Sequence, residues 1–249
     1  MISIADLANV KKLTIPEGVV KKIRVNDIYV WEEATNEVTY TPIEYIQFTG
    51  SQRIDTNLYC NQNTKIEIVF TRESSASKYL YAALSDGNKA TVSAYLGSSA
   101  AWRFGNTYKG FTLSTGESNI HTMIVNKSGI TYNGTLNKYG STVSNFTTPV
   151  TLTIGSAKNS NGSYGTTQFV GKIYSFKMYN GSTLVADYVP SISSEGEYGF
   201  FDNVTGDFKP SETDTPFNNE TATFAINTLD LNEFDEIELS EIVEHTELM

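Results

Sequence analysis

The segment Lys65-Ile66-Glu67-Ile68-Val69-Phe70 alternates, with Ile66, Ile68 and Phe70 on one side of the chain. A period of two is typical of a β-strand that buries one face and exposes the other. Similar runs recur roughly every 8–14 residues, as expected for an all-β domain. They lie at residues 80–84, 90–96, 120–126, 130–134, 150–154, 169–179 and 184–189. No helical periodicity competes with them, so the sequence predicts a β-sandwich or jelly roll.

Turn residues separate these runs. Asp86-Gly87-Asn88, Lys127-Ser128-Gly129 and Asn180-Gly181-Ser182 are tight-turn sequences, and the last predicts a hairpin between its flanking strands. The Gly-, Ser- and Asn-rich stretches at 97–101 and 156–167 are predicted to be surface loops.

The composition agrees with an all-β class. Aromatic residues make up 12% of the 249 residues, chiefly 15 Tyr and 13 Phe. Charged residues, at 18%, fall below the average of about 25% for soluble proteins. Polar surface must therefore come from Ser, Thr, Asn and Gly, as in many extracellular and virion β-proteins.

Charge is distributed unevenly along the chain. Of its 28 acidic residues, 11 lie between Pro210 and Met249, where there is no Lys or Arg. The preceding residues hold 17 acids and 18 bases and are nearly neutral. The only clusters of adjacent basic residues are the short pairs Lys11-Lys12 and Lys21-Lys22. Nucleic-acid binding requires a larger basic cluster, so it is not expected. No run approaches the roughly 18–20 apolar residues of a membrane span.

Cysteine and histidine are too sparse for several kinds of site. Cys60 is alone, so no internal disulfide is expected, and the two histidines, His121 and His245, are far apart. A zinc site is therefore not expected. The first residues lack a basic segment followed by an apolar run, so we expect synthesis in the cytoplasm without an export signal.

The pattern predicts four regions. Residues 1–33 form a β-hairpin attachment unit that turns at Asn26-Asp27 and is too small for its own core. Residues 34–39 are a linker and 40–210 the jelly-roll domain. Residues 211–249 are an acidic tail. From Asp230 onward the tail is either an amphipathic helix or a segment that orders only in an assembly.

Two segments carry a family resemblance. Residues 40–56, YTPIEYIQFTGSQRIDT, resemble the opening strand of concanavalin A-like (laminin-G-like) jelly-roll domains in bacteriophage tail and structural proteins. Residues 169–179, continuing through 184–190 to Gly199-Phe200-Phe201-Asp202, resemble the closing hairpin of the same family. The stretch from Lys12 to Trp31 also resembles an element at the head of phage tail proteins.

The resemblance implies a non-enzymatic virion protein of a tail fibre, baseplate or head fibre. Such a protein binds host-surface glycans or proteins and assembles as a homo-oligomer, often a trimer. Its partners in the virion would be reached through the N-terminal unit, the acidic tail or both. Two alternatives remain: a purely structural decoration or fibre subunit, and a glycan depolymerase.

Six residues are candidates for ligand binding. Trp102, Arg103, Asn106 and Tyr108 combine aromatic rings with planar hydrogen-bonding groups, the parts that a sugar site requires. Tyr59 and Tyr164 lie in polar surroundings and are expected to be exposed. The competing interpretation is that strand aromatics such as Trp102 belong to the core.

Metal and catalytic motifs are weaker. Asp86, Asp202 and Asp207 could offer oxygen ligands to Ca²⁺, but they also fit ordinary Asx turns. No other cofactor is expected. Glu233, Asp235 and Glu238 have the spacing of laminarinase-type glycoside hydrolases, which use two carboxylates about 5.5 Å apart. In so acidic a tail this spacing arises by chance, and no enzyme is predicted.

Overall fold

The chain divides between Thr39 and Tyr40 into two compact units. This computed structural model describes residues 22–25, 28–32, 38–73, 76–97, 100–111 and 119–218. In the first unit, β1 (Lys22–Val25) and β2 (Ile28–Glu32) pair antiparallel with Val25 opposite Ile28. The hairpin predicted around Asn26-Asp27 is therefore confirmed.

One sheet of the second unit has seven strands, in the order β10-β9-β8-β7-β14-β5, with β15 parallel to β7. The short 3₁₀ helix η1 (Asp86–Asn88) connects β7 to β8. The strands are β5 (Ile54–Asn61), β7 (Lys78–Ala83), β8 (Thr91–Leu96), β9 (Ala100–Gly105), β10 (Thr107–Phe111), β14 (Thr147–Ile154) and β15 (Ala157–Lys158).

The second sheet has ten strands, in the order β13-β12-β11-β6-β16-β17-β18-β19. Two short strands extend it, β3 beside β17 and β4 beside β16. The strands are β3 (Tyr40–Pro42), β4 (Ile46–Thr49), β6 (Thr64–Arg72), β11 (His121–Asn126), β12 (Gly129–Tyr132), β13 (Thr135–Asn137), β16 (Val170–Asn180), β17 (Thr183–Ser193), β18 (Tyr198–Asp202) and β19 (Phe208–Pro210).

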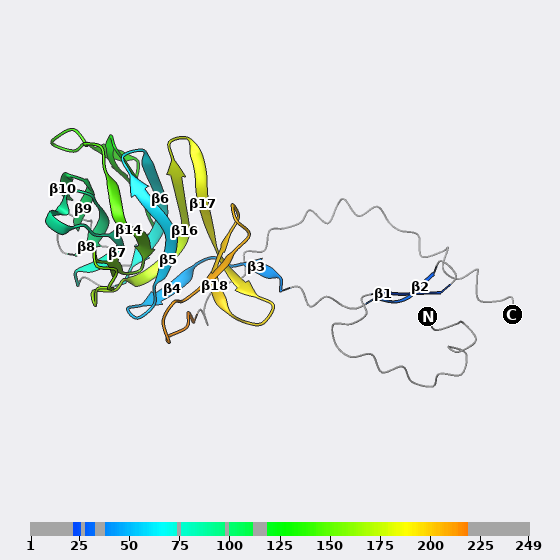
Figure 1. Ribbon diagram of the computed structural model, residues 1–249. Helices are drawn as coiled ribbons and strands as arrows, with labels where there is room; N and C mark the ends of the chain where they lie inside the picture. Colours follow the sequence, from blue (N-terminus) through cyan, green and yellow to red (C-terminus); the bar gives the residue numbers. More distant parts are fainter. Residues whose placement is uncertain are drawn as a thin grey trace, which may run out of the picture. The chain divides into compact units, whose positions relative to one another are not determined.

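The chain passes repeatedly between the two sheets (Figure 1). It moves from β5 to β6, back to β7, and later from β13 to β14 and on to β16, changing sheet each time. Such crossings between two antiparallel layers are characteristic of a jelly roll. The predicted all-β jelly-roll sandwich is confirmed.

The core lies between the two sheets and follows the alternation seen in the sequence. Ile66, Ile68 and Phe70 on β6 are at most 1% exposed. From the other sheet, Val92 and Trp102 point into the same cluster. Burying each such side chain contributes about 1.5–3 kcal/mol. Each strand therefore turns its apolar face toward the other sheet, as the period-two pattern predicts.

The opening and closing segments of the sandwich meet in one sheet. Strand β4 pairs with β16, and β3 pairs with β17. Gly171 on β16 lies between Phe48 and Arg72 of the neighbouring strands with φ of 150°. A Cβ there would come within 2.2 Å of the Thr71 carbonyl oxygen, so this close pairing requires glycine.

The sandwich continues beyond its predicted end at Pro210. Phe217 is 3% exposed and makes an edge contact with Phe48 at 4.9 Å between ring centroids. The Gln52 side-chain amide donates to the Pro216 carbonyl at 3.2 Å. The boundary between domain and tail is therefore corrected to a point after Phe217, because this side chain belongs to the core.

Other predictions for the tail fall on residues 219–249, outside the described part of the chain. These are the amphipathic helix from Asp230 and the carboxylate motif at Glu233, Asp235 and Glu238. Among the residues that are described, no helix has the length and apolar character needed to cross a membrane.

Candidate functional site

A hollow of about 220 Å³ opens over β7, β8, β9 and β10. Val92, Ala94 and Trp102 on these strands point into the core, so the alternate residues Ser93 and Arg103 face outward. The cavity therefore lies on the outer face of the seven-stranded sheet. We call it the outer hollow; its lining is Tyr79, Leu84, Asn88, Ser93, Tyr95, Ala101, Arg103 and Tyr108.

Strand register brings the lining together. Tyr79 lies opposite Tyr95, and Arg103 lies between Ser93 on one side and Tyr108 on the other. The small side chains of Ser93 and of Ala101, which lies opposite Tyr95, leave space between these larger groups. Apart from Leu84 and Asn88, which lie between β7 and β8, the lining is carried by paired strands, which hold its groups more rigidly than loops would.

The tyrosine rings supply flat apolar surfaces. Tyr79 and Tyr95 pack with ring centroids 4.7 Å apart and planes inclined at 55°. Tyr108 is 54% exposed, and the Arg103 guanidinium carbon lies 5.3 Å from its ring centroid. Burial and the nearby Tyr95 raise the pKa of Tyr79 despite the opposing effect of Arg103, so its hydroxyl stays neutral at physiological pH.

Arg103 alone is charged among the eight residues that line the outer hollow. Its guanidinium forms no ion pair with any residue in the described ranges. Hydroxyls of tyrosine and Ser93 and the amide of Asn88 add neutral donors and acceptors. The cavity therefore offers aromatic faces, neutral polar groups and one cation.

A wider depression of about 520 Å³ adjoins the outer hollow and shares Leu84 and Asn88 with it. Asn159, Ser160 and Asn161 from the loop after β15 contribute to its lining. Asp86 also lines it and accepts a hydrogen bond from the Ser160 hydroxyl at 2.6 Å. The two cavities therefore lie next to each other, with Arg103 in the lining of one and Asp86 in the lining of the other.

Trp102 does not form an exposed aromatic platform, and that expectation is corrected. Its side chain is 0% exposed and belongs to the core cluster. On β9 the neighbours Arg103 and Ala101 point the other way, because successive strand residues alternate between faces. Of the four residues from 102 to 108 that were expected to bind ligand, Arg103 and Tyr108 line the outer hollow.

The other candidates lie elsewhere. The Asn106 side-chain oxygen accepts the Ser144 backbone N–H at 2.9 Å, which ties two loops together. Tyr59 is 57% exposed on β5, the edge strand across the sheet from β10. Tyr164 is half-buried beneath the Arg53 guanidinium, which lies 3.9 Å from its ring centroid. None of these three lines the outer hollow.

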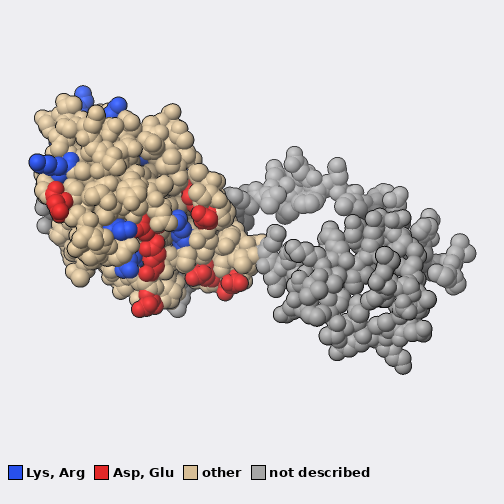
Figure 2. Space-filling model, viewed as in Figure 1, with Lys and Arg blue, Asp and Glu red and all other residues tan. Residues whose placement is uncertain are grey.

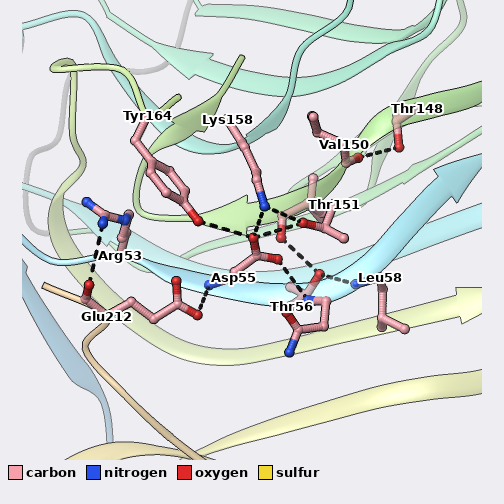
Figure 3. A network of polar contacts seen from close by, with 12 residues as sticks. Arg53, Asp55, Thr56, Leu58, Thr148, Val150, Thr151, Lys158, Tyr164 and Glu212 are labelled. Atoms are coloured by element: carbon pink, nitrogen blue, oxygen red, sulfur yellow. Dashed lines mark hydrogen bonds and ion pairs between the residues drawn. The ribbon is translucent and has the colours of Figure 1, made fainter. Parts of the chain in front are cut away.

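Tyr164 instead belongs to a polar network centred on Asp55 (Figure 3). One Asp55 oxygen accepts hydrogen bonds from the Lys158 ammonium, the Thr151 hydroxyl at 2.8 Å and the Tyr164 hydroxyl at 3.3 Å. The Asp55 side chain is 6% exposed and that of Lys158 19%. Because its groups satisfy one another, the network holds the loop after β15 against the sheet rather than offering a free site.

The network shifts the pKa of both charged members. Burial alone would raise the pKa of Asp55, but hydrogen bonds from Lys158, Thr151 and the Asn57 N–H outweigh it and lower the pKa. Burial alone would lower the pKa of Lys158, but Asp55 outweighs it and raises the pKa. The pair is therefore ionised at neutral pH.

The segment after β19 attaches to this network. A Glu212 carboxylate oxygen accepts the Asp55 backbone N–H at 2.9 Å, and the Glu212 N–H donates to the Arg53 carbonyl at 3.0 Å. These bonds fix the chain that leads to Phe217.

The proposed calcium ligands are engaged in turns. Asp202 is buried, and one of its oxygens accepts the backbone N–H groups of Asp187 and Val204. The other accepts the Thr205 hydroxyl at 3.1 Å, while Asp207 contributes its carbonyl to the same turn. Within the described ranges, no group of three or more His, Cys, Asp or Glu is placed to hold a metal ion. The bonding is that of an Asx turn.

Cys60 and His121 have structural surroundings. Cys60 is buried in the core, which raises the pKa of its thiol to about 12 and suppresses its reactivity. Burial, aided by Arg72, lowers the pKa of His121, whose Nδ1 lies 2.8 Å from the Tyr132 hydroxyl.

Tyr79, Tyr95, Ser93 and Asn88 also line the outer hollow, although no pattern in the sequence marks them as ligand-binding residues. Strand β8 was recognised, and its alternation would have placed Ser93 and Tyr95 on the face opposite Val92 and Ala94. Ser93 and Tyr95 lie beside Tyr79 and Arg103 because of the strand register and the β9–β10 hairpin. Residues 100 and 101 of that hairpin fall in the stretch predicted to be a loop. No short motif signals that arrangement.

Surface charge is sparse on the face shown in Figure 2, where Lys and Arg are interspersed with Asp and Glu among wide uncharged areas.

No protein-family model and no curated protein sequence matches the chain. Among solved structures, it is similar to the native heptameric SAP-like pentraxin from Limulus polyphemus, with 10% identity and a TM-score of 0.38. The similarity covers 57% of this chain and 76% of the pentraxin. The fold assignment rests on the strand order and register described above.

Proposed function

We propose that this protein is a non-enzymatic virion component that binds a saccharide of the host surface in the outer hollow. The observation that carries the binding proposal is the set of outward-facing Tyr79, Tyr95, Arg103 and Tyr108 around a floor of small residues. The depression beside it gives room for a second sugar unit.

The chemistry of the outer hollow fits a sugar. The C–H faces of a pyranose ring pack on flat aromatic surfaces, and its hydroxyls bond to planar amide and guanidinium groups. Tyr108 supplies an exposed face, and Asn88 and Arg103 supply the planar groups. The recess is open and mixed in polarity, which suits a hydrated ligand better than an apolar one.

The virion assignment draws on the two segments that resemble phage jelly-roll domains, and these pair with each other in the ten-stranded sheet. The separate N-terminal unit would attach the sandwich to other virion proteins, together with the acidic tail. Such a protein would act as a homo-oligomer, in particular a trimer, so that several weak sugar contacts add through avidity.

The test is a glycan array probed with the full chain and with Tyr108→Ala. Loss of one exposed aromatic contact should lower affinity by roughly tenfold. Tyr59→Ala is the matched control, because Tyr59 is equally exposed but lies outside the outer hollow. It should bind like the wild type.

Other outcomes would replace the proposal. Absence of glycan binding with normal incorporation into particles would identify a purely structural decoration or fibre subunit. Cleavage of a host polysaccharide that is abolished by Glu233→Gln would identify a depolymerase.

A further inference from the structure

The charge of the outer hollow narrows the class of sugar. Arg103 is its single charged lining residue and has no ionic partner among the described residues. Arg103 is half-buried, and a charge that is partly removed from water without a counter-ion is unfavourable, so a bound anion would stabilise it. We propose, resting on the function proposed above, that the outer hollow selects saccharides that carry a carboxylate, such as uronic or nonulosonic acids.

The neighbours of Arg103 favour this role. The Arg103 guanidinium carbon lies 5.3 Å from the centroid of the Tyr108 ring on β10, and its cross-strand neighbour on β8 is the small Ser93. The planar N–H groups of arginine match the two oxygens of a carboxylate. Partial burial reduces water screening, so the charged hydrogen bonds are stronger than on an open surface.

The number of charges favours a carboxylate over a phosphate monoester. One guanidinium compensates one negative charge, whereas a phosphate monoester carries about 1.5–2 at neutral pH. No Lys joins Arg103 in the lining. A sulfate ester is also singly charged and can present two oxygens to the guanidinium, so the experiment compares sulfated and carboxylated ligands directly.

The residues that line the adjoining depression indicate how an oligosaccharide is oriented across the two cavities. Asp86 lies at its lining together with the neutral Asn159 and Asn161. A carboxylate there would be repelled by Asp86. The acidic sugar therefore lies over Arg103, and neutral units of the same oligosaccharide extend toward the Asn-rich end.

The experiment compares matched ligands that differ only in charge. Isothermal titration of the full chain would compare galacturonic acid with its methyl ester and sialyllactose with its methyl ester, and would include sulfated lactose as a further acidic ligand. The acidic member of at least one pair should bind roughly 10–100-fold more tightly, since a charged hydrogen bond contributes about 1.5–3 kcal/mol. Raising the salt concentration should weaken only the acidic ligand.

Three variants locate the preference. Arg103→Gln should bring the acidic and neutral ligands to similar affinity, while Arg103→Lys should retain part of the difference. Asp86→Asn should leave the preference intact or strengthen it. Thermal unfolding of each variant, expected to match the wild type, confirms that the sandwich is folded.

The outcomes are distinguishable. Equal or tighter binding of the neutral members, or an unchanged preference in Arg103→Gln, overturns the inference and leaves the saccharide site standing. Tighter binding of sulfated lactose than of sialyllactose would overturn the choice of carboxylate. Absence of binding to every ligand on the array and in these pairs would overturn both proposals.

Discussion

Adjacent residues on β9 have opposite environments. Trp102 fills the core, and Arg103 faces solvent in the outer hollow. Both residues were predicted to bind a ligand, because composition alone does not say which side of a strand faces inward. Burial favours the larger apolar side chain, so the tryptophan occupies the core and the arginine is left outside.

Lys158→Met should lower the free energy of unfolding by on the order of 3 kcal/mol, because it leaves the Asp55 carboxylate buried without its cation. Urea unfolding at neutral pH measures this. Lys65→Met is the control, since the Lys65–Glu67 pair is about one-third exposed on each side and contributes little. Equal losses in the two variants would contradict the central place of Asp55.

The same network should make stability depend on pH. The folded pKa of Asp55 lies below the ordinary 3.8, so its contribution is present above that value and is lost as pH falls through the folded pKa. The folded pKa of Lys158 lies above 10.5, so its contribution is present below 10.5 and is lost as pH rises through the folded pKa. Unfolding curves of the wild type and Lys158→Met should therefore converge on acidification below about pH 4.

At the scale of elements, the segment after β19 completes the sandwich. Phe217 inserts beside Phe48 and Phe200, and Glu212 bonds to the backbone at Asp55. Nothing in its composition distinguishes this stretch from the acidic tail, so the sequence placed the boundary too early. A single aromatic among polar residues carries no periodic signal.

Phe217→Ala should therefore cost about 3–5 kcal/mol of stability through lost burial and a residual cavity. Truncation after Pro210 should lower the stability further, because it removes Glu212 as well as Phe217. Truncation after Asn218 is the matched control and should unfold like the full chain. Calorimetry of the three proteins would decide, and a stable Pro210 truncation would contradict the extended boundary.

Strand pairing makes Gly171→Ala a sensitive substitution. Its Cβ would meet the Thr71 carbonyl oxygen, and a φ of 150° is unfavourable for any side chain. We expect a loss of roughly 1–3 kcal/mol or poor expression. Gly181→Ala, at a turn with a φ of 63° and open space, should cost less. Similar melting temperatures for the two would argue against a tight register at Gly171.

At the scale of the whole molecule, the sequence predicted the architecture better than the site. Alternation in β6, β11 and β16 is strong because one face of each strand is buried, and the two family-like segments lie where the sandwich opens and closes. The outer hollow joins residues from β7 to β10 through register, and its members follow no local pattern. Of its lining residues, only Arg103 and Tyr108, which are close in sequence, were among the residues predicted to bind a ligand.

The division at Thr39 leads to a prediction about assembly. Deletion of residues 1–33 should leave glycan affinity unchanged, because the outer hollow is made entirely by the sandwich. It should abolish incorporation into particles if the N-terminal unit is the attachment point. Particle association can be followed by co-sedimentation, and normal incorporation of the shortened chain would assign attachment to the tail.

The bond from Gln52 to the Pro216 carbonyl joins residues 164 positions apart, and β3 and β4 likewise pair with strands near the other end of the domain. During synthesis, the apolar face around Phe48 cannot be buried until nearly the whole domain has left the ribosome, because the segments that cover it are made last. Contacts of such long sequence separation form slowly, in milliseconds to seconds. We therefore expect β4 to be the segment of the nascent chain most prone to aggregation and the one to which a chaperone would bind.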